Sequence, residues 1–170
     1  MTARVERVLT SGVFTLDGQS FDVDNNVWLY GDDASVVIID AAHDAAAIAA
    51  AVGGRSVELI VCTHGHNDHI DAARALARVT GATVALHPDD RMLWDQLYPD
   101  WAPGRDLVDG EPLPLGLIVL HTPGHSPGGV CLRADGLVFT GDTLFAGGLV
   151  RRGARTRTSR RSSTRSGRGC

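Results

Sequence analysis

The sequence predicts an α+β fold in which helices pack against β layers. Residues 5–40 contain short β-branched runs separated by Asp, Asn and Gly, which predicts two or three antiparallel strands. Strand-like and helical patterns alternate over residues 43–97, and three short strand-like runs occupy residues 117–141. A chain of 170 residues, 44% of them hydrophobic, is long enough for one domain with a substantial core.

The middle of the chain reads as strands alternating with helices. Residues 43–52 are rich in alanine and end at Gly53, which predicts a helix with a glycine stop. Residues 57–62, VELIVC, predict a short buried strand, and residues 70–81 place apolar side chains at helical spacing before another glycine. The elements that follow are a strand at 82–86, a helix around 89–97, and three antiparallel strands at 117–122, 129–134 and 136–141.

The composition excludes several classes of protein. No apolar run approaches the roughly 20 residues needed to cross a bilayer, and the first residues lack a signal-like apolar stretch. We therefore expect a soluble cytoplasmic protein with no membrane partner. All 20 acidic residues precede position 150, and such an acidic body argues against a nucleic-acid partner. Nothing in the sequence indicates an oligomeric state.

Four residues that can bind zinc lie within six positions, directly after the strand predicted at 57–62. They are His64, His66, Asp68 and His69. Imidazole nitrogens and carboxylate oxygens bind zinc at about 2.0 to 2.2 Å. Alternating positions of a strand-end loop can aim the first two at one ion, and the last two then face a neighbouring ion. Gly65 lets this loop turn tightly, so a metal site is favoured over an ordinary polar loop.

Two later motifs also follow predicted strands. HTPGHSPGG, at 121–129, projects His125 from a loop stiffened by proline and glycine. TGDTLFAGG, at 140–148, places Asp142 after a glycine at a strand end, which suits a carboxylate that bridges two cations. We expect the remaining histidines to bind no metal. His121 would lie at a strand end or support the ligands from behind, and His43 and His87 would lie at the surface or at helix caps.

The motifs HxHxDH, HTPGHSPG and GDTLF, in this order, resemble the pattern of the metallo-β-lactamase superfamily. The residues within these motifs are most similar to those of its glyoxalase II-like, or hydroxyacylglutathione hydrolase-like, branch. The resemblance implies an αββα sandwich with its metal site at one edge of the sheets. The ligands that it implies are His64, His66 and His125 for a first ion, Asp68 and His69 for a second, and Asp142 as a bridge. Asp40 resembles the family's non-ligand aspartate that supports the site.

The same resemblance implies a metal-dependent hydrolase. In a complete site, two cations about 3.5 to 4 Å apart lower the pKa of a shared water and supply hydroxide. Asp68 would be the catalytic residue, because it can ligate the second ion and orient the proton of the nucleophile. The implied cofactor is zinc, two ions per complete site, with iron or manganese as alternatives. The implied substrate is a small-molecule thioester, because a thiolate is a weakly basic leaving group.

Other functions stay open at this point. A lactonase or a β-lactamase of the same superfamily would use the same chemistry, and a non-catalytic metal-binding remnant is an alternative of a different class. The family normally continues for several dozen residues to a final histidine of the second metal site, whereas no histidine follows His125 here. We therefore expect a partial sandwich that lacks its C-terminal portion, and impaired activity.

Residues 151–170 differ sharply in composition from residues 1–150. They hold 8 of the 16 basic residues, no acidic residue and almost no apolar side chain, so they cannot bury a core face. We expect residues 1–150 to form the incomplete metal-binding domain and residues 151–170 to be a disordered, arginine-rich tail that is not native to it. A shifted reading frame would explain this tail, because its codons can be chosen so that another frame restores acidic and aromatic residues. A nucleic-acid-binding arm is disfavoured, because no aromatic residue is interleaved for base stacking.

Overall fold

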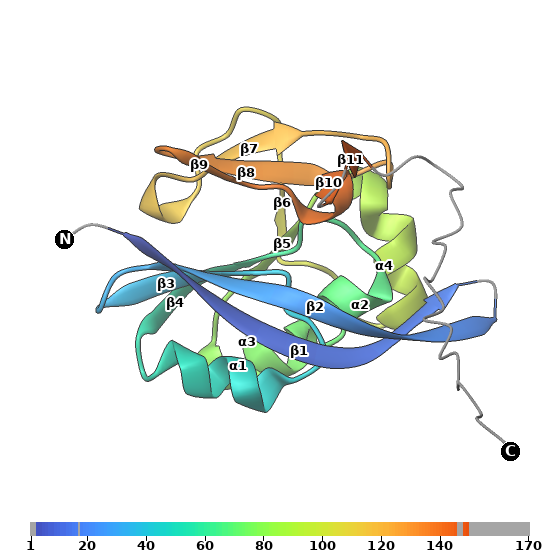
Figure 1. Ribbon diagram of the computed structural model, residues 1–170, viewed down its shortest axis with the longest axis horizontal. Coiled ribbons are helices and arrows are strands. Elements are labelled where there is room, and N and C mark those ends of the chain that lie inside the picture. Colours follow the sequence, from blue (N-terminus) through green and yellow to red (C-terminus); the bar gives the residue numbers. More distant parts are fainter. Residues whose placement is uncertain (1–2, 17, 146–147, 150–170) are drawn as a thin grey trace, which may run out of the picture.

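The computed structural model describes residues 3–16, 18–145 and 148–149, and it has the layered α+β architecture expected from the sequence (Figure 1). A six-stranded sheet with the order β1-β2-β3-β4-β5-β6 faces a three-stranded sheet with the order β7-β8-β9. Helices α1 and α3 lie against the outer face of the larger sheet (Figure 1). The predicted tail at 151–170 lies outside the described residues, as do residues 146–147 of the third motif.

Three antiparallel strands begin the chain, as predicted. They are β1 (Arg4–Leu16), β2 (Gln19–Gly31) and β3 (Ser35–Ile39). The long hairpin of β1 and β2 keeps one register from the pair Arg4 and Gly31 to the pair Leu16 and Gln19. Only the half of β2 near β3 is deeply buried, and Val27 and Leu29 there have no exposed surface. The hairpin therefore projects its other half beyond the core.

The central strands run parallel to β3, and helices connect the first of them. These elements are α1 (Ala45–Val52), β4 (Ser56–Val61), α3 (Ala73–Thr80), β5 (Val84–Leu86) and β6 (Arg105–Asp106). Asp44 starts α1 by accepting a hydrogen bond from the N–H of Ala47, at 2.9 Å. Gly53 ends α1 with a φ of +65°, so the predicted glycine stop is confirmed. The carboxyl ends of β3 and β4 consequently lie at one edge of the sheet, where the first histidine motif follows.

The histidine segment is not wholly a loop, which corrects the prediction. Asn67–Ile70 forms one helical turn, α2, in which the N–H of Asp71 donates to the carbonyl of Asn67 at 3.0 Å. The turn forms because Ile70, which has no exposed surface, packs into the core. A four-residue turn is too short to produce a periodic pattern, so the sequence did not reveal it.

The remaining helices and the second sheet follow in the predicted order. Two helical segments cover the expected region around 89–97: η1 (Pro88–Asp90) and α4 (Arg91–Leu97). After η2 (Pro114–Gly116) come three antiparallel strands, β7 (Ile118–His121), β8 (Val130–Ala134) and β9 (Leu137–Phe139). The last described elements are η3 (Gly141–Thr143), β10 (Leu144–Phe145) and β11 (Gly148–Leu149), and the sequence did not predict these three or β6.

Two hydrophobic clusters hold the layers together. Alternate residues of the six-stranded sheet point to opposite faces, so that Ile38 packs toward the helices while Val37 and Ile39 pack toward the second sheet. The second sheet contributes Leu132 and Phe139 to the cluster between the sheets. The layers are therefore helix, sheet and sheet, and in the described part of the chain no helix covers the outer face of β7–β9 (Figure 1).

Trp94 anchors α4 in the helix-side cluster. It has no exposed surface, and its indole N–H donates to the carbonyl of Trp101 at 2.6 Å. The Tyr98 ring packs beside it at a tilt, with the ring centroids 4.9 Å apart. The Tyr98 hydroxyl donates toward the carbonyls of Ile70 and Asp71, at 3.0 and 2.8 Å. These contacts fix the end of α2, the turn that carries two of the candidate ligands.

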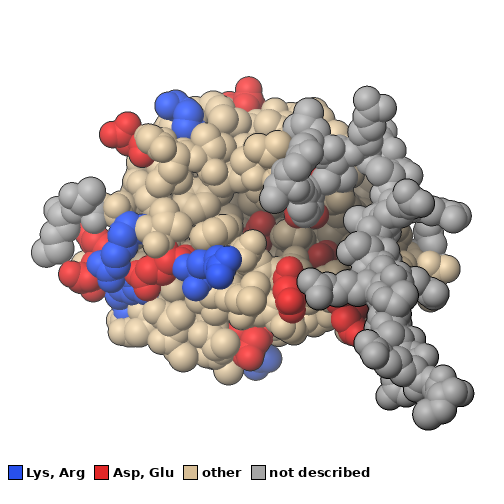
Figure 2. All heavy atoms as spheres, viewed as in Figure 1, with Lys and Arg blue, Asp and Glu red and all other residues tan. Residues whose placement is uncertain are grey.

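Charged side chains of both signs share the surface. Arg55 donates two hydrogen bonds to the Glu6 carboxylate, at 2.7 and 3.2 Å, which joins β1 to the turn before β4. The guanidinium of Arg55 lowers the pKa of Glu6 below its ordinary value. On the face shown in Figure 2, acidic and basic side chains of the described residues lie interspersed. No helix in the described part of the chain has the length and apolar character needed to cross a bilayer.

Candidate metal centre

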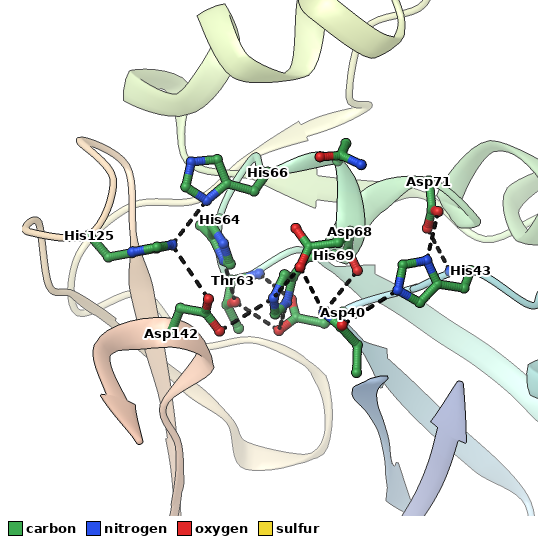
Figure 3. A network of polar contacts seen from close by, with 12 residues as sticks. Asp40, His43, Thr63, His64, His66, Asp68, His69, Asp71, His125 and Asp142 are labelled. Atoms are coloured by element: carbon green, nitrogen blue, oxygen red, sulfur yellow. Dashed lines mark hydrogen bonds and ion pairs between the residues drawn. The ribbon is translucent and has the colours of Figure 1, made fainter. Parts of the chain in front are cut away.

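The three motifs meet at one edge of the sandwich, between the two sheets (Figure 3). Their metal-ligand candidates are His64 and His66 after β4, Asp68 and His69 on α2, His125 between β7 and β8, and Asp142 in η3 after β9. A backbone hydrogen bond from the N–H of Val130 to the carbonyl of Thr63, 2.8 Å long, joins the start of β8 to the first motif. The fold therefore brings together segments that are some 60 residues apart in sequence, the separation of His66 and His125 being 59.

Three imidazoles converge in a first group. One nitrogen from each of His64, His66 and His125 lies within 4.8 Å of the other two. His66 Nδ1 and His125 Nε2 are 2.9 Å apart, and the ring of His64 stands nearly perpendicular to the ring of His66. Rings at such angles direct their nitrogen lone pairs toward a common point, which is the arrangement that a tetrahedral cation requires.

Asp142 lies between the first group and a second one. Its Oδ2 is 3.4 Å from His125 Nε2, and its Oδ1 is 3.3 Å from His69 Nε2 (Figure 3). One ligand atom from each of His64, His69 and Asp142 also lies within 4.8 Å of the others. Asp68 Oδ2 is 3.7 Å from His69 Nε2. A carboxylate with one oxygen toward each group has the geometry of a bridge between two cations.

Two buried atoms of this site have no hydrogen-bond partner among the described residues. They are His64 Nε2 and Asp68 Oδ1. A buried polar atom left unpaired costs about 1 to 3 kcal/mol, so such atoms call for an explanation. Both belong to the predicted ligand set, and both are donor types that divalent transition metals bind. The residues present therefore fit a metal centre.

Burial and neighbouring histidines favour the neutral form of two histidines, His64 and His66. Burial lowers the pKa of His64 well below its ordinary value, and the neighbouring His69 lowers it further. Burial and the neighbouring His125 also lower the pKa of His66. Both rings are consequently neutral near pH 7, and the neutral imidazole is the form that binds a cation.

His69 behaves differently because two carboxylates face it. Burial alone would lower the pKa of His69, but Asp40 and Asp142 outweigh burial and raise it well above the ordinary value. Burial alone would raise the pKa of Asp142, but its contact with His69 lowers that pKa. A positive charge is thus stabilised between Asp40 and Asp142, at the position where the second cation is predicted.

Asp40 lies behind the site, in the supporting position that the resemblance implies. Its Oδ1 accepts a hydrogen bond from the Thr63 N–H at 2.7 Å, and its Oδ2 accepts one from the Thr63 hydroxyl at 2.8 Å. The same Oδ2 lies 3.1 Å from His69 Nδ1. When His69 donates from Nδ1 to Asp40, its Nε2 lies on the side of Asp142. Asp40 also has a φ of +57°, an uncommon backbone conformation for a residue other than glycine.

Sequence reasoning missed two residues that hold Asp68. The amide of Asn25 donates to Asp68 Oδ2 at 3.1 Å and to the Asp68 carbonyl at 3.0 Å. His43 lies behind this amide, with its Nε2 3.4 Å from Asn25 Oδ1 and its Nδ1 2.9 Å from Asp71 Oδ2. The expectation of a surface or cap position for His43 is wrong, since its side chain is 3% exposed. In the sequence, Asn25 is only one of the Asp, Asn and Gly residues that lie between strand-like runs and indicate turns.

A third group of potential ligands does not converge. His87, Asp89 and His121 offer atoms within 4.8 Å of one another, but the two rings are stacked at 4.0 Å with an angle of 12°. Lone pairs of parallel rings lie in parallel planes and do not meet at one ion. His87 accepts a hydrogen bond from the Asp89 N–H as the cap of η1, and His121 ends β7. The cap and strand-end positions predicted for these histidines are confirmed.

Comparison with known proteins agrees with this geometry. The sequence model of the family described as "Metallo-beta-lactamase superfamily" matches residues 21–168. A hydroxyacylglutathione hydrolase of Anaeromyxobacter dehalogenans is 35% identical over 136 residues, covering 78% of this chain and 51% of the relative. A hydroxyacylglutathione hydrolase of Acidiphilium cryptum is 36% identical over 142 residues, covering 81% and 56%. The chain thus spans about half the length of the curated relatives it matches.

Two solved structures illustrate the fold that this chain shares. TTHA1623 in a di-iron-bound form has a TM-score of 0.64 and 33% sequence identity, covering 74% of this chain and 71% of that one. The BLEG-1 B3 metallo-β-lactamase has a TM-score of 0.68 and 26% identity, covering 87% and 78%. The layered sandwich of this chain is therefore a partial form of the fold shared by these proteins.

Proposed function

Because this chain belongs to the metallo-β-lactamase superfamily, we propose that it is a metal-dependent hydrolase of the glyoxalase II-like kind. The observation that carries the proposal is the convergence of His64, His66 and His125, with Asp142 placed between them and His69. The relatives named hydroxyacylglutathione hydrolase support a thioester of a small thiol as the substrate. A thioester suits the site, because a thiolate leaves with little help from a general acid.

We propose zinc as the metal, and the di-iron form of TTHA1623 supports iron as an alternative. The first ion would be held by His64, His66, His125 and Asp142, and the second by Asp68, His69 and Asp142. When bound, the two cations supply Lewis acidity toward a carbonyl oxygen and lower the pKa of a water between them. The first set offers three imidazoles and the second only one, so the first ion should be held more tightly. Activity below that of a complete site follows from this difference.

Asp68 is the residue that we propose as catalytic. Asn25 binds its Oδ2, whereas its Oδ1 is buried without a partner among the described residues. One oxygen is thus fixed by the protein, and the other is left to face the site. A carboxylate held in this way can orient a nucleophilic water and take its proton, which contributes about 10² to 10⁴ in rate for a positioned acid or base.

The site opens into a small recess between the two sheets. Its lining includes the hydroxyl residues Thr122, Ser126 and Thr143 beside the ligand candidates. Phe14, near the tip of the β1–β2 hairpin, lies edge-on to His66 with the ring centroids 5.7 Å apart. The hydroxyl groups of this recess could donate hydrogen bonds to a polar substrate bound beside the site, and the Phe14 ring adds an apolar surface on the outer side of His66. The cytoplasmic location and the lack of a nucleic-acid partner remain predictions from the composition.

A lactonase or β-lactamase activity is the second candidate. The similarity to BLEG-1 favours it, because that structure matches more of this chain than TTHA1623 does. A non-catalytic, metal-binding remnant is the third candidate, and the weaker second set of ligands favours it. The chemistry of the site is common to the two enzymes, so only turnover separates them.

The test is an assay of the zinc-loaded full chain with three substrates side by side: S-lactoylglutathione, an acyl lactone and a cephalosporin. We expect the thioester to be hydrolysed fastest, and Asp68→Asn to lower kcat by at least about 10²-fold. Asp95→Asn is the matched control, because Asp95 is an exposed aspartate paired with Arg91 on α4. Faster hydrolysis of the lactone or the cephalosporin would favour the second candidate. Zinc binding without turnover of any substrate would favour the third.

A further inference from the structure

Asp90 is a buried carboxylate that none of the three motifs contains. It ends η1, directly before α4, and has no exposed surface. An aspartate is rarely buried so completely unless its oxygens are paired. Its partners therefore indicate what it does.

Among the described residues, the three hydrogen-bond donors to the Asp90 side chain come from the two histidine loops. Asp90 Oδ2 accepts from the Gly65 N–H at 2.9 Å and from the Ser126 hydroxyl at 2.7 Å. Asp90 Oδ1 accepts from the Gly128 N–H at 2.6 Å. Gly65 lies between His64 and His66 in the chain, and Ser126 directly follows His125. One carboxylate thus binds both loops that carry the imidazoles of the first set.

The two glycines fit closely against Asp90. A Cβ atom on Gly128 would lie 2.6 Å from the Asp90 nitrogen and 2.9 Å from its Cβ. A Cβ atom on Gly65 would lie 2.9 Å from the Asp90 carbonyl oxygen. These distances are too short for a real Cβ atom at either position, so only glycine allows the loops to approach Asp90 this closely. The contact is therefore specific to Asp90 and to these two loop positions.

We propose that Asp90 is a positioning residue for the first metal ion. It touches neither the ion nor the substrate; it holds the loops of His66 and His125 so that their nitrogens stay 2.9 Å apart. Without its acceptor oxygens the two loops lose their shared anchor, and each imidazole can turn away from the common point. The proposal rests on the proposed metal centre and adds a residue that acts behind it.

The test replaces Asp90 with asparagine, which has a similar shape but only one acceptor oxygen, and compares cobalt(II) binding of the full chain. We expect Asp90→Asn to raise the dissociation constant of the tightest cobalt(II) ion by about 10- to 100-fold, as for outer residues that orient metal ligands. The visible absorption of bound cobalt should also change, because that spectrum reports the geometry of the ligands. Ser126→Ala removes one of the three donors and should cause a smaller change in the same direction.

A control separates positioning from general stability. Leu76→Ala removes a buried side chain of α3, a helix that carries no candidate ligand, from the helix-side cluster. This variant should lower the melting temperature while leaving the cobalt affinity and spectrum as in the wild type. The inference is overturned if Asp90→Asn keeps the wild-type affinity and spectrum, or if Leu76→Ala weakens cobalt binding equally. If Asp90→Asn does not fold, a wild-type spectrum and affinity in Ser126→Ala overturns it instead. A wild type that binds no cobalt would contradict the proposed metal centre itself.

Discussion

Asp40 connects the end of β3 to two parts of the metal centre. Its two oxygens bind the Thr63 N–H, the Thr63 hydroxyl and the Nδ1 side of His69. The first contacts set the path of the chain after β4, and the last sets which nitrogen of His69 faces the site. One buried carboxylate thus determines the position of a backbone segment and the orientation of a candidate ligand.

We expect the variant Asp40→Asn to fold but to have a weakened site. Asn tolerates the positive φ of Asp40, so Asp40→Asn changes mainly the hydrogen bonds. Its Oδ1 can still accept from the Thr63 N–H, but its Nδ2 cannot accept from the Thr63 hydroxyl. We expect the free energy of unfolding to fall by about 1 to 3 kcal/mol, because this buried hydroxyl loses its acceptor. Urea unfolding of the metal-free protein measures this loss. Asp33→Asn, at an exposed position, should change stability by less than about 0.5 kcal/mol; equal losses in both variants would contradict the role of Asp40.

Residues with ligand chemistry could be predicted from the sequence, but the residues that hold them could not. His64, His66, Asp68 and His69 stand out because four potential ligands lie within six positions after a strand. Asn25 and Asp90 do not stand out, because their partners lie 43 and 38 residues away and no local pattern records such pairs. Only the folded chain shows that they bind the loops of the site.

Among the elements, α4 and the residue that follows it stabilise the turn that carries Asp68 and His69. The Tyr98 hydroxyl binds the last carbonyls of α2, and burial raises the pKa of Tyr98 to about 12. The position of α2 therefore depends on a contact from outside the motif. A four-residue turn has little stability of its own, so this contact matters more than it would for a long helix.

Tyr98→Phe should lower the free energy of unfolding by about 0.5 to 1.5 kcal/mol, because it removes this hydrogen bond and keeps the ring. Tyr30→Phe is the control, since Tyr30 is a buried tyrosine of β2 for which no hydroxyl hydrogen bond is found among the described residues. Urea unfolding at pH 7 compares the two, and equal losses would argue against the anchor.

The pH dependence of the same variants adds a second comparison. The unfolded chain loses its tyrosine proton near pH 10, whereas folded Tyr98 keeps its proton to about pH 12. The wild type should therefore lose stability as the pH rises above about 10, since the unfolded state then binds fewer protons than the folded state. Tyr98→Phe should show less of this loss.

Elements with a pattern of their own were predicted, and the short ones were not. The glycine stops of α1 and α3 and the alternation of β7–β9 are local signals, and the structure confirms them. The two-residue strand β6 and the turn α2 form through contacts with distant parts of the chain. A pattern of two to four residues is too short to indicate either.

In the whole molecule, the candidate metal centre lies where the two sheets meet. His64 and His69 belong to the side of the larger sheet, whereas His125 and Asp142 belong to loops at the ends of β7 and β9. A cation bound by both groups would join the layers in addition to the cluster of apolar side chains between them. Metal binding and the packing of the second sheet should therefore stabilise each other.

The central claim is that histidines from two separated loops bind the same divalent cation. Anomalous diffraction at the zinc edge, from crystals of the full chain grown with zinc, tests it most directly. The account predicts the strongest peak about 2.0 to 2.1 Å from one ring nitrogen of each of His64, His66 and His125. A weaker second peak should lie beside Asp68 and His69. A strongest peak at any other position, or a structure in which His66 and His125 share no peak, would contradict the account.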